Sequence, residues 1–472
     1  MSKITLTIDG KKVEVEAGTT ILRAAQEVGI EIPHYCYHPG LALAGNCRMC
    51  LVEAEKSPKP LASCVAPVQE GMVVKTKTDA VVQMRKSVME FLLINHPLDC
   101  PTCDQAGECR LQDYYMDYDR IPSRFAEEKV HKGKMEDLGA GVMLDEERCI
   151  ACTRCIRVCQ EVAKEDELTL ANRGNHVMIS TFPGKKLSNP YAGNTIDVCP
   201  VGALTSEDFR FKKRVWFLKS TPSICPGCSR GCNINVGQEE SKVYRLLPRV
   251  NPEVNQYWMC DEGRYGYHSV NENRFLRATI QEKGKRTWLS PDEAISRLAE
   301  VLKQKNLSEI AVVAHASETV ETLEALDQFS KNILKTRLQF FSRFDPAKPY
   351  SDNILITADK NANQKAIDKL GHKPLSELKQ ASGLLVLRDL TPGEQSQIQK
   401  SGIPVLAFFA VNDVIAASPS QFVFPIPSYV EQEGSFINVQ NKVQKISRAF
   451  EPQGESRLMV EWLDDLSVLL NG

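Results

Sequence analysis

Cysteines are the residues of this sequence best suited to chemistry, with 16 among 472 residues. Three of them, Cys100, Cys103 and Cys109, share a short segment with His96, and two prolines and a glycine keep that segment from forming a continuous helix. Thiolates and imidazoles bind transition metals, so the four side chains can meet at one metal centre. Taken alone, the segment fits either a tetrahedral zinc ion or an iron–sulfur cluster.

The remaining cysteines form three further sets with the close spacing of metal ligands. In chain order, the first set is Cys36, Cys47, Cys50 and Cys64; the second is the His96 segment; the third is Cys149, Cys152, Cys155 and Cys199; the fourth is Cys225, Cys228, Cys232 and Cys260. Only Cys159 is left over. The start of the sequence has no recognisable secretory signal, which favours metal ligation over disulfides. We therefore expect four iron–sulfur clusters.

The first set follows a segment with strong local signals. Apolar and polar residues alternate on both sides of Asp9-Gly10 over residues 3–16, which predicts a β-hairpin. A helix over Thr20–Val28, ended by Gly29, should follow. A hairpin, a helix and then a cysteine loop are typical of a β-grasp ferredoxin. We interpret the first set as ligands of a [2Fe-2S] cluster, with Gly45 letting backbone N–H groups approach the sulfurs.

The second set follows a predicted helix. Apolar residues recur at three- and four-residue intervals from Asp79 to Asn95, which predicts an amphipathic helix leading directly to His96. A neutral imidazole in place of an anionic thiolate changes the charge of a cluster. Residues 110–145 are polar, and we expect only a loop that crosses to the next cluster segment.

The third set has the spacing of a bacterial ferredoxin, in which two cysteine runs share two clusters. A second cluster would need cysteines at positions that hold Asn189, Ala192 and Thr195. One cluster is therefore expected to be lost. The third set can hold the other as [4Fe-4S], and Cys159 should be a buried free thiol.

The fourth set fits zinc or a [4Fe-4S] cluster. We favour the cluster, because Gly227, Gly231 and Gly263 would leave room for backbone around a cubane.

Beyond residue 272 the pattern changes to alternating strands and helices. Ser290 and Thr391 each begin a capping box with proline at the first helical position, which predicts helices to about Gln304 and to Gly402, and Glu318–Ile333 is a third predicted helix. Strands are predicted at Ile310–Ala314, Leu384–Leu387 and Val405–Phe409. This order predicts a doubly wound, mostly parallel sheet. The sequence contains no glycine-rich nucleotide motif, and His315 is expected to be structural.

Composition excludes some classes of function. The net charge of −2 gives no overall field toward nucleic acid. No window approaches the roughly 18 apolar residues that a membrane span needs. We therefore expect a soluble protein that binds no nucleic acid.

The order of the sites resembles the large iron–sulfur subunit (the G subunit) of bacterial NADH:quinone oxidoreductase, respiratory complex I. The resemblance implies one [2Fe-2S] cluster on the first set and one [4Fe-4S] cluster on each of the other three. It also implies a degenerate molybdopterin-oxidoreductase-like α/β domain at the end, which the stretch Glu431–Asn438 resembles as well. That domain is expected to be shortened, and no cysteine beyond Cys260 is left to bind molybdenum.

The implied function is electron relay within the complex. The chain would pass electrons from a flavin/NADH-binding subunit toward the quinone-side iron–sulfur subunits, with no complete active site of its own. It would be cytoplasmic, and peripheral at the cytoplasmic face of the inner membrane only through the complex. Two alternatives remain: the electron-transfer subunit of a soluble NAD-linked hydrogenase or formate dehydrogenase, and a zinc-stapled structural scaffold.

The expected fold class is therefore multidomain, α+β and α/β. The expected domains are a β-grasp [2Fe-2S] domain at 1–78, a His/Cys [4Fe-4S] domain at 79–118, a ferredoxin-like [4Fe-4S] domain at 140–212, a molybdopterin-oxidoreductase-type [4Fe-4S] domain at 215–271, and a truncated α/β domain at 272–472.

Overall fold

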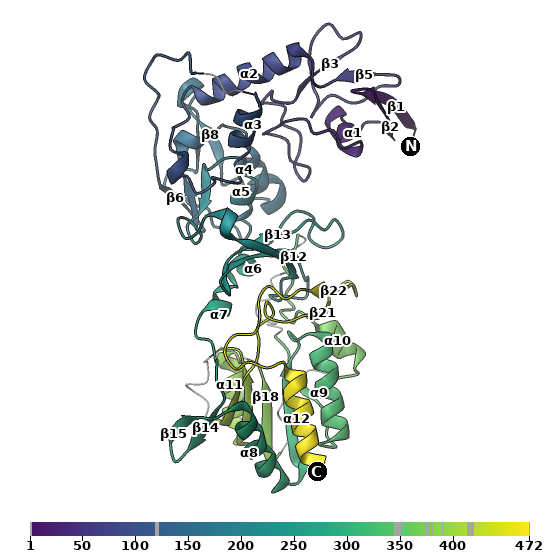
Figure 1. Ribbon diagram of the computed structural model, residues 1–472, viewed down its shortest axis with the longest axis vertical. Coiled ribbons are helices and arrows are strands. Elements are labelled where there is room, and N and C mark those ends of the chain that lie inside the picture. Colours follow the sequence, from purple (N-terminus) through teal and green to yellow (C-terminus); the bar gives the residue numbers. More distant parts are fainter. Residues whose placement is uncertain are drawn as a thin grey trace. The chain divides into compact units, whose positions relative to one another are not determined.

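The computed structural model describes residues 2–118, 122–343, 351–352, 354–372, 375, 378, 381–388, 390–412 and 420–471. The chain divides into two compact units, Met1–Phe217 and Leu218–Gly472 (Figure 1). Across these described ranges, no helix is both long and apolar enough to cross a membrane.

The first unit begins with a five-stranded mixed sheet in the order β2-β1-β5-β3-β4. Its strands are β1 (Lys3–Ile8), β2 (Lys11–Glu16), β3 (Leu51–Ala54), β4 (Leu61–Ala62) and β5 (Val73–Lys75). The predicted hairpin is confirmed, because β1 and β2 pair antiparallel and Asp9 and Gly10 both have positive φ, at 47° and 83°. The predicted helix is α1 (Ile21–Glu27), with the Thr20 side chain as its N-cap.

Two helices flank the second set. The predicted amphipathic helix is α2 (Asp79–Leu93), with Thr78 as its N-cap. His96 therefore lies three residues after the last residue of this helix, Leu93. The expectation of a loop over 110–145 was wrong at both ends of that range. Residues Arg110–Tyr118 form helix α3, and two strands occur before residue 145, while residues 119–121 lie outside the described part.

The third set lies among short elements. A three-stranded sheet has the order β10-β7-β6, and a separate hairpin pairs β8 with β9. The elements are β6 (Glu136–Gly139), β7 (Val142–Leu144), α4 (Arg154–Arg157), a π-helical turn (Val158–Ala163), β8 (Thr169–Ala171), β9 (Met178–Ser180), α5 (Asn194–Asp197) and β10 (Leu204–Ser206). Short 3₁₀ turns occur at Cys100–Thr102, Glu146–Arg148, Gly174–His176 and Val215–Phe217.

The second unit begins with an antiparallel sheet that carries the fourth set. The strands of this sheet are β11 (Lys219–Ile224), β12 (Asn233–Glu239) and β13 (Lys242–Pro248). Two short helices follow it, α6 (Asp261–Tyr265) and α7 (His268–Asn271). Cys225 follows β11 directly, Cys232 immediately precedes β12, and Cys260 caps α6, so strand and helix ends position these thiols.

A seven-stranded sheet forms the core of the second unit, in the order β15-β14-β20-β19-β18-β16-β17 (Figure 1). Its strands are β14 (Thr279–Glu282), β15 (Lys285–Trp288), β16 (Ile310–His315), β17 (Gln339–Phe341), β18 (Gly383–Leu387), β19 (Val405–Ala410) and β20 (Ser420–Pro425). The prediction of a mostly parallel sheet is confirmed from β17 through β20. The antiparallel edge pair β14 and β15 was not anticipated.

Helices cover both faces of this sheet. They are α8 (Pro291–Lys303), α9 (Val320–Asn332), α10 (Gln364–Lys369), α11 (Pro392–Ser401) and α12 (Met459–Asn471). Apolar residues of α8, α9 and α12 share one cluster with the strands, whereas Ile398 of α11 belongs to the cluster on the other face. The hairpin of β21 (Gly434–Ile437) and β22 (Val443–Ile446) completes the unit.

The two predicted capping boxes differ. At Thr391 both reciprocal hydrogen bonds with Glu394 are present. At Ser290 the side chain accepts from the N–H of Glu293, which is one of the two hydrogen bonds of a capping box. The Glu293 carboxylate accepts from Arg297 at 2.8 Å instead of from the backbone of Ser290.

Candidate iron–sulfur sites

The first set converges in the loop between α1 and β3 and at the turn after β4. The thiol of Cys36 is hydrogen-bonded to those of Cys47 and Cys64, and Cys64 is also bonded to Cys50. The bond from Cys64 lowers the pKa of Cys50 to about 7. The backbone N–H of Asn46, directly after Gly45, also bonds to the Cys36 sulfur, whereas a Cβ at Gly45 itself would meet Val65 at 3.1 Å and not a sulfur.

The second set is only partly assembled by the described contacts. Cys103 and Cys109 are buried and lie within electrostatic range of the exposed Cys100. Burial lowers the pKa of His96 to about 4, which keeps the imidazole in the neutral form that can bind a metal. No described contact joins this ring to the three thiols, so its role as fourth ligand stays a prediction.

A close approach joins the second set to the third. A Cβ added at Gly202, three residues after Cys199, would overlap the sulfur of Cys103. The N–H of Arg110 also donates to the carbonyl of Pro200 at 3.1 Å. The loop that ends the third set therefore packs directly on the cysteine loop of the second.

A charge network that is buried only in part contacts the loop of the second set. Lys134 Nζ lies 2.7 Å from Glu147 and 3.4 Å from Asp99, and the Arg148 guanidinium lies 2.5 Å from Asp99 and 3.4 Å from Asp145. Arg148 is only 5% exposed, so its own two ion pairs are largely shielded from solvent, whereas Lys134 is 43% exposed. The network ties the loop of the second set to the turn before the third, and no local sequence pattern indicated it.

The third set lines one cavity. All four cysteines line one small cavity whose walls also include Leu144, Ile179, Val201, Ala203 and Leu204. Ala151 and Thr153, which alternate with the ligands, have φ of 50° and 62°, a left-handed conformation that costs free energy in a residue with a Cβ. In this conformation the N–H of Ala151 donates a hydrogen bond to the sulfur of Cys149 at 3.4 Å.

Burial disfavours bare thiolates at this site. It raises the pKa values of Cys149, Cys152 and Cys199 to about 11. These thiols are therefore protonated at neutral pH until a positively charged metal centre displaces the protons. The donor set of four thiols, the apolar walls and the N–H···S bond all fit an iron–sulfur cluster.

Cys159 is buried, as expected, and does not line that cavity. It lies in the π-helical turn, and its thiol is hydrogen-bonded to the side chain of Asn189. Asn189 donates in turn to Glu167 at 2.5 Å, and Thr195 bonds to the carbonyl of Ala192 at 2.6 Å. Hydrogen bonds therefore satisfy the positions where a second ferredoxin cluster would need cysteines.

We expect Cys159→Ser to retain every cluster, because Cys159 lies outside the cavity. Cys199→Ser should lose the cluster of the third set, because it removes one of four thiols that face the cavity. Iron analysis and low-temperature electron paramagnetic resonance of the two purified variants check this pair. Loss of a [4Fe-4S] signal in the Cys159 variant would make Cys159 a ligand.

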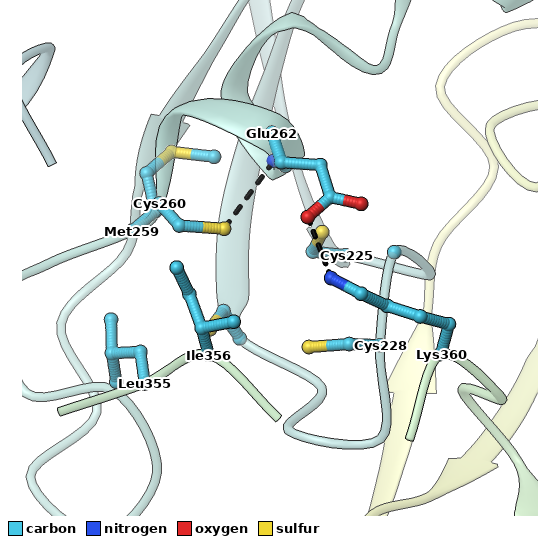
Figure 2. Close-up of a pocket in the computed structure, with 11 residues that line it drawn as sticks. Cys225, Cys228, Met259, Cys260, Glu262, Leu355, Ile356 and Lys360 are labelled. Carbon is cyan, nitrogen blue, oxygen red and sulfur yellow. Dashed lines mark hydrogen bonds and ion pairs between the residues drawn. The ribbon is translucent and has the colours of Figure 1, made fainter. Parts of the chain in front are cut away.

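The fourth set also lines one small cavity (Figure 2). A Cβ at Gly263 would lie 3.0 Å from the sulfur of Cys225, and one at Gly227 would lie 3.5 Å from it, so both glycines leave room beside the thiols as predicted. Gly231 does not, because a Cβ there would meet Gln444 and Asn438 instead. The N–H of Gly263 donates to Cys260 Sγ at 3.4 Å.

Side chains from a distant segment close this cavity, and local sequence patterns gave no sign of them. Leu355, Ile356 and Lys360 line it together with the cysteines, and Lys360 lies on the side of Cys225 and Cys228 (Figure 2). Lys360 Nζ also forms an ion pair with Glu262 at 2.6 Å. Four thiols around a space with apolar cover fit a [4Fe-4S] cluster.

Within the described residues, no group of three or more His, Cys, Asp or Glu side chains is arranged to hold a single metal ion.

Charged side chains occupy the edge of the large sheet where such folds bind ligands. The chain leaves β16 toward β17 on one side and β18 on the other, and ligands of doubly wound sheets bind at the carboxyl ends beside this switch point. Here Glu318, after β16, forms a bidentate ion pair with Arg388, after β18. Beside them, His315 Nε2 lies 3.0 Å from Glu394, which also contacts Arg343. His315 is fully buried and hydrogen-bonded, which supports a structural role.

These buried groups predict that acid destabilises the second unit. Burial lowers the pKa of His315 below 6.5. Burial alone would raise the pKa of Glu394, but the hydrogen bond from His315 and nearby Arg343 lower it to about 2. Below pH 6.5 the unfolded chain therefore binds a proton on His315 that the folded chain excludes, and below about pH 4.5 the same holds for Glu394.

The free energy of unfolding should thus fall as the pH drops from 7 toward 3, by up to about 1.4 kcal/mol per pH unit for each group. Urea unfolding followed by tryptophan fluorescence at successive pH values measures this free energy of unfolding. His315→Gln should flatten the part of the curve between pH 6.5 and 4.5. An unchanged slope in that variant would contradict the assignment.

Family models match four successive segments of the chain. They are a 2Fe-2S iron-sulfur cluster binding domain at residues 1–79, an NADH-ubiquinone oxidoreductase-G iron-sulfur binding region at 85–123, the ferredoxin-like domain of NADH-quinone oxidoreductase subunit 3 at 139–205, and a molybdopterin oxidoreductase Fe4S4 domain at 218–272. The chain therefore carries iron–sulfur-binding domains of both the 2Fe-2S and the 4Fe-4S kind.

Curated relatives carry matching names. The G subunit of NADH-quinone oxidoreductase from Rickettsia bellii (strain RML369-C) is 44% identical over 330 residues, 70% of this chain and 48% of the relative. The NADH-ubiquinone oxidoreductase 75 kDa subunit of Reclinomonas americana is 40% identical over 393 residues, 81% of this chain and 55% of the relative. A chain in the crystal structure of NAD⁺-reducing [NiFe]-hydrogenase in the H₂-reduced state is 29% identical, with a TM-score of 0.42 over 45% of this chain and 92% of its own.

The chain spans about half the length of the curated relatives it matches. Within that half, relatives about 44% identical and the run of iron–sulfur segments agree. The chain belongs to the family of the NADH-quinone oxidoreductase G subunit.

Proposed function

We propose that this chain is an electron relay of NADH:quinone oxidoreductase. The observation that carries the proposal is the convergence of buried thiols in sets, two of which line cavities of their own. Iron–sulfur clusters held there would accept and pass on single electrons. The protein's part would be to hold the clusters of the third and fourth sets in largely apolar cavities and to donate backbone N–H groups to ligand sulfurs.

The proposed ligands are the members of the four sets, and each set is proposed to bind one cluster. The first set would hold one [2Fe-2S] cluster in a β-grasp domain. The His96 set would hold a [4Fe-4S] cluster, the third set another in a ferredoxin-like domain, and the fourth set a third in a molybdopterin-oxidoreductase-type domain. The domain boundaries proposed for these segments remain 1–78, 79–118, 140–212, 215–271 and 272–472.

The proposed partners are a flavin- and NADH-binding subunit, which supplies the electrons, and quinone-side iron–sulfur subunits, which take them. The chain would meet the inner membrane at its cytoplasmic face only through these subunits. The ion pairs at the carboxyl edge of the large sheet support the proposal that this domain has no working molybdopterin site. They fill the edge where such a ligand would bind.

Anaerobic titration tests the relay. Dithionite should bleach the visible absorption of the cluster-loaded chain, whereas NADH alone should leave it unchanged, because the sequence contains no phosphate-binding loop. Adding the flavin-bearing partner should allow NADH to bleach the absorption of those clusters whose potentials lie above that of the NADH couple. Bleaching by NADH without any partner would contradict the proposal.

The subunits that co-purify with an affinity-tagged chain from its own cells distinguish the assemblies. A flavin-bearing subunit together with quinone-side subunits is expected. A nickel-containing or formate-oxidising catalytic subunit in their place would support the hydrogenase or formate dehydrogenase alternative.

The proposed ligand role of His96 has a direct test. His96→Cys should keep a cluster but lower its midpoint potential, because a thiolate adds negative charge where the neutral imidazole adds none. A redox titration monitored by electron paramagnetic resonance measures the shift. An unchanged potential would mean that His96 does not bind the cluster.

A further inference from the structure

Two arginines of helix α4 connect the first and third cysteine sets. Arg157 is 9% exposed, and its Nη2 donates to the carbonyl of Cys36 at 2.5 Å and to the carbonyl of Cys152 at 3.4 Å. Its Nη1 donates to the carbonyl of Ala42 in the same loop as Cys36. One guanidinium nitrogen thus joins a predicted ligand of each cluster.

Arg154, one helical turn earlier, repeats this arrangement. Its Nη1 donates to the carbonyl of Val198, next to Cys199, at 3.1 Å. Its Nη2 donates to the carbonyl of Tyr37, next to Cys36. Arg154 also lines the cavity of the third set.

Further contacts close the gap between the two loops. The Asn46 side chain lies 3.4 Å from the carbonyl of Ala151, and the N–H of Ala42 donates to Glu161 at 2.7 Å.

Among the described residues, the buried Nε groups of Arg154 and Arg157 have no hydrogen-bond partner. An anionic cluster in the cavity that Arg154 lines would place negative charge next to this guanidinium.

We propose that Arg154 and Arg157 act as positioning residues that place two positive charges between the [2Fe-2S] and [4Fe-4S] clusters and thereby make both easier to reduce. The inference rests on the proposed function, because it requires the first and third sets to hold clusters. Neither residue accepts or passes electrons itself.

The physical reason is the change in charge on reduction. A reduced cluster carries one more negative charge than its oxidised form, so a nearby cation stabilises the reduced form. Guanidinium groups stay protonated at every accessible pH, and a protein interior screens them far less than water does. The bonds to ligand carbonyls also fix the two loops at one separation.

The test compares midpoint potentials in the full chain, reconstituted anaerobically. In Arg154→Gln and Arg157→Gln we expect the one-electron equilibrium constant for reduction to fall at least tenfold at both clusters, equivalent to 59 mV for one electron. Arg154→Lys and Arg157→Lys should stay close to the native potentials, because they keep the charge. Arg173→Gln is the matched control, since it removes the same charge from an exposed position of the first unit.

Each outcome is informative. Native potentials in both Gln variants, with both clusters present, would overturn the inference and leave the electron relay standing. If the Gln variants do not hold clusters, the Lys variants decide: retained clusters at native potentials support the role of charge, and cluster loss there too overturns it. A native chain that holds no clusters in these two sets would overturn the proposed function together with this inference.

Discussion

Metal analysis of the anaerobically reconstituted chain is expected to find about fourteen iron atoms per chain and no tightly bound zinc. The count follows from two irons on the first set and about four on each of the other three. Removing Cys199 should lower it to about ten, because the cavity of the third set then has only three of its four thiols. Visible absorption should fall in proportion.

The same measurement separates the rival assignments. A zinc scaffold would bind up to about four metal ions and be colourless, because zinc has no redox chemistry. Iron near ten with zinc present would place zinc in one set, and the fourth set is the first to examine because it belongs to the second compact unit. A value of two to four irons would contradict the multi-cluster relay.

Replacing Glu431 with alanine should cost about 3–5 kcal/mol of unfolding free energy, because it leaves a buried arginine without its counter-charge. Arg274 and Glu431 have side chains 4% and 0% exposed, and their charged groups lie 2.6 Å apart. The Glu431 carboxylate also accepts from the N–H and hydroxyl of Ser428 and from the N–H of Gln453. One carboxylate therefore links three segments of the second unit.

Urea unfolding followed by tryptophan fluorescence measures this loss, since Trp462 is buried in the same unit. Glu433→Ala, two residues away and exposed, is the matched control and should change stability by less than about 0.5 kcal/mol. A cost below about 1 kcal/mol for Glu431→Ala would show that the ion pair is not required for folding.

Local sequence signals determined the elements whose causes are local. Asp9-Gly10 predicted its hairpin because two adjacent positive φ values are easily adopted by these two residue types. Thr20 and Thr391 predicted helix starts because a side-chain oxygen satisfies free backbone N–H groups at a helix terminus. The closely spaced cysteines of each set were equally plain, whereas Cys64, Cys199 and Cys260 come from later elements.

Periodicity also identified three core strands of the second unit, β16, β18 and β19, whose apolar runs need burial on both faces, but it did not identify β17 or the buried β20. It also did not find the edge hairpin of β14 and β15, because each strand has only four residues and β15 is mostly exposed. The segment 110–145 was misjudged for a similar reason. Helix α3 is polar overall and buries only Leu111 and Tyr114.

Only the tertiary structure decided what surrounds each predicted cluster. Arg157 and Cys36 are 121 residues apart, and Leu355 closes a cavity whose cysteines begin at Cys225. Such contacts leave no periodic or local signal, because they depend on how separately formed elements pack. The sequence by itself therefore determined which residues are candidate ligands, and the fold determined which charges and apolar side chains lie around them.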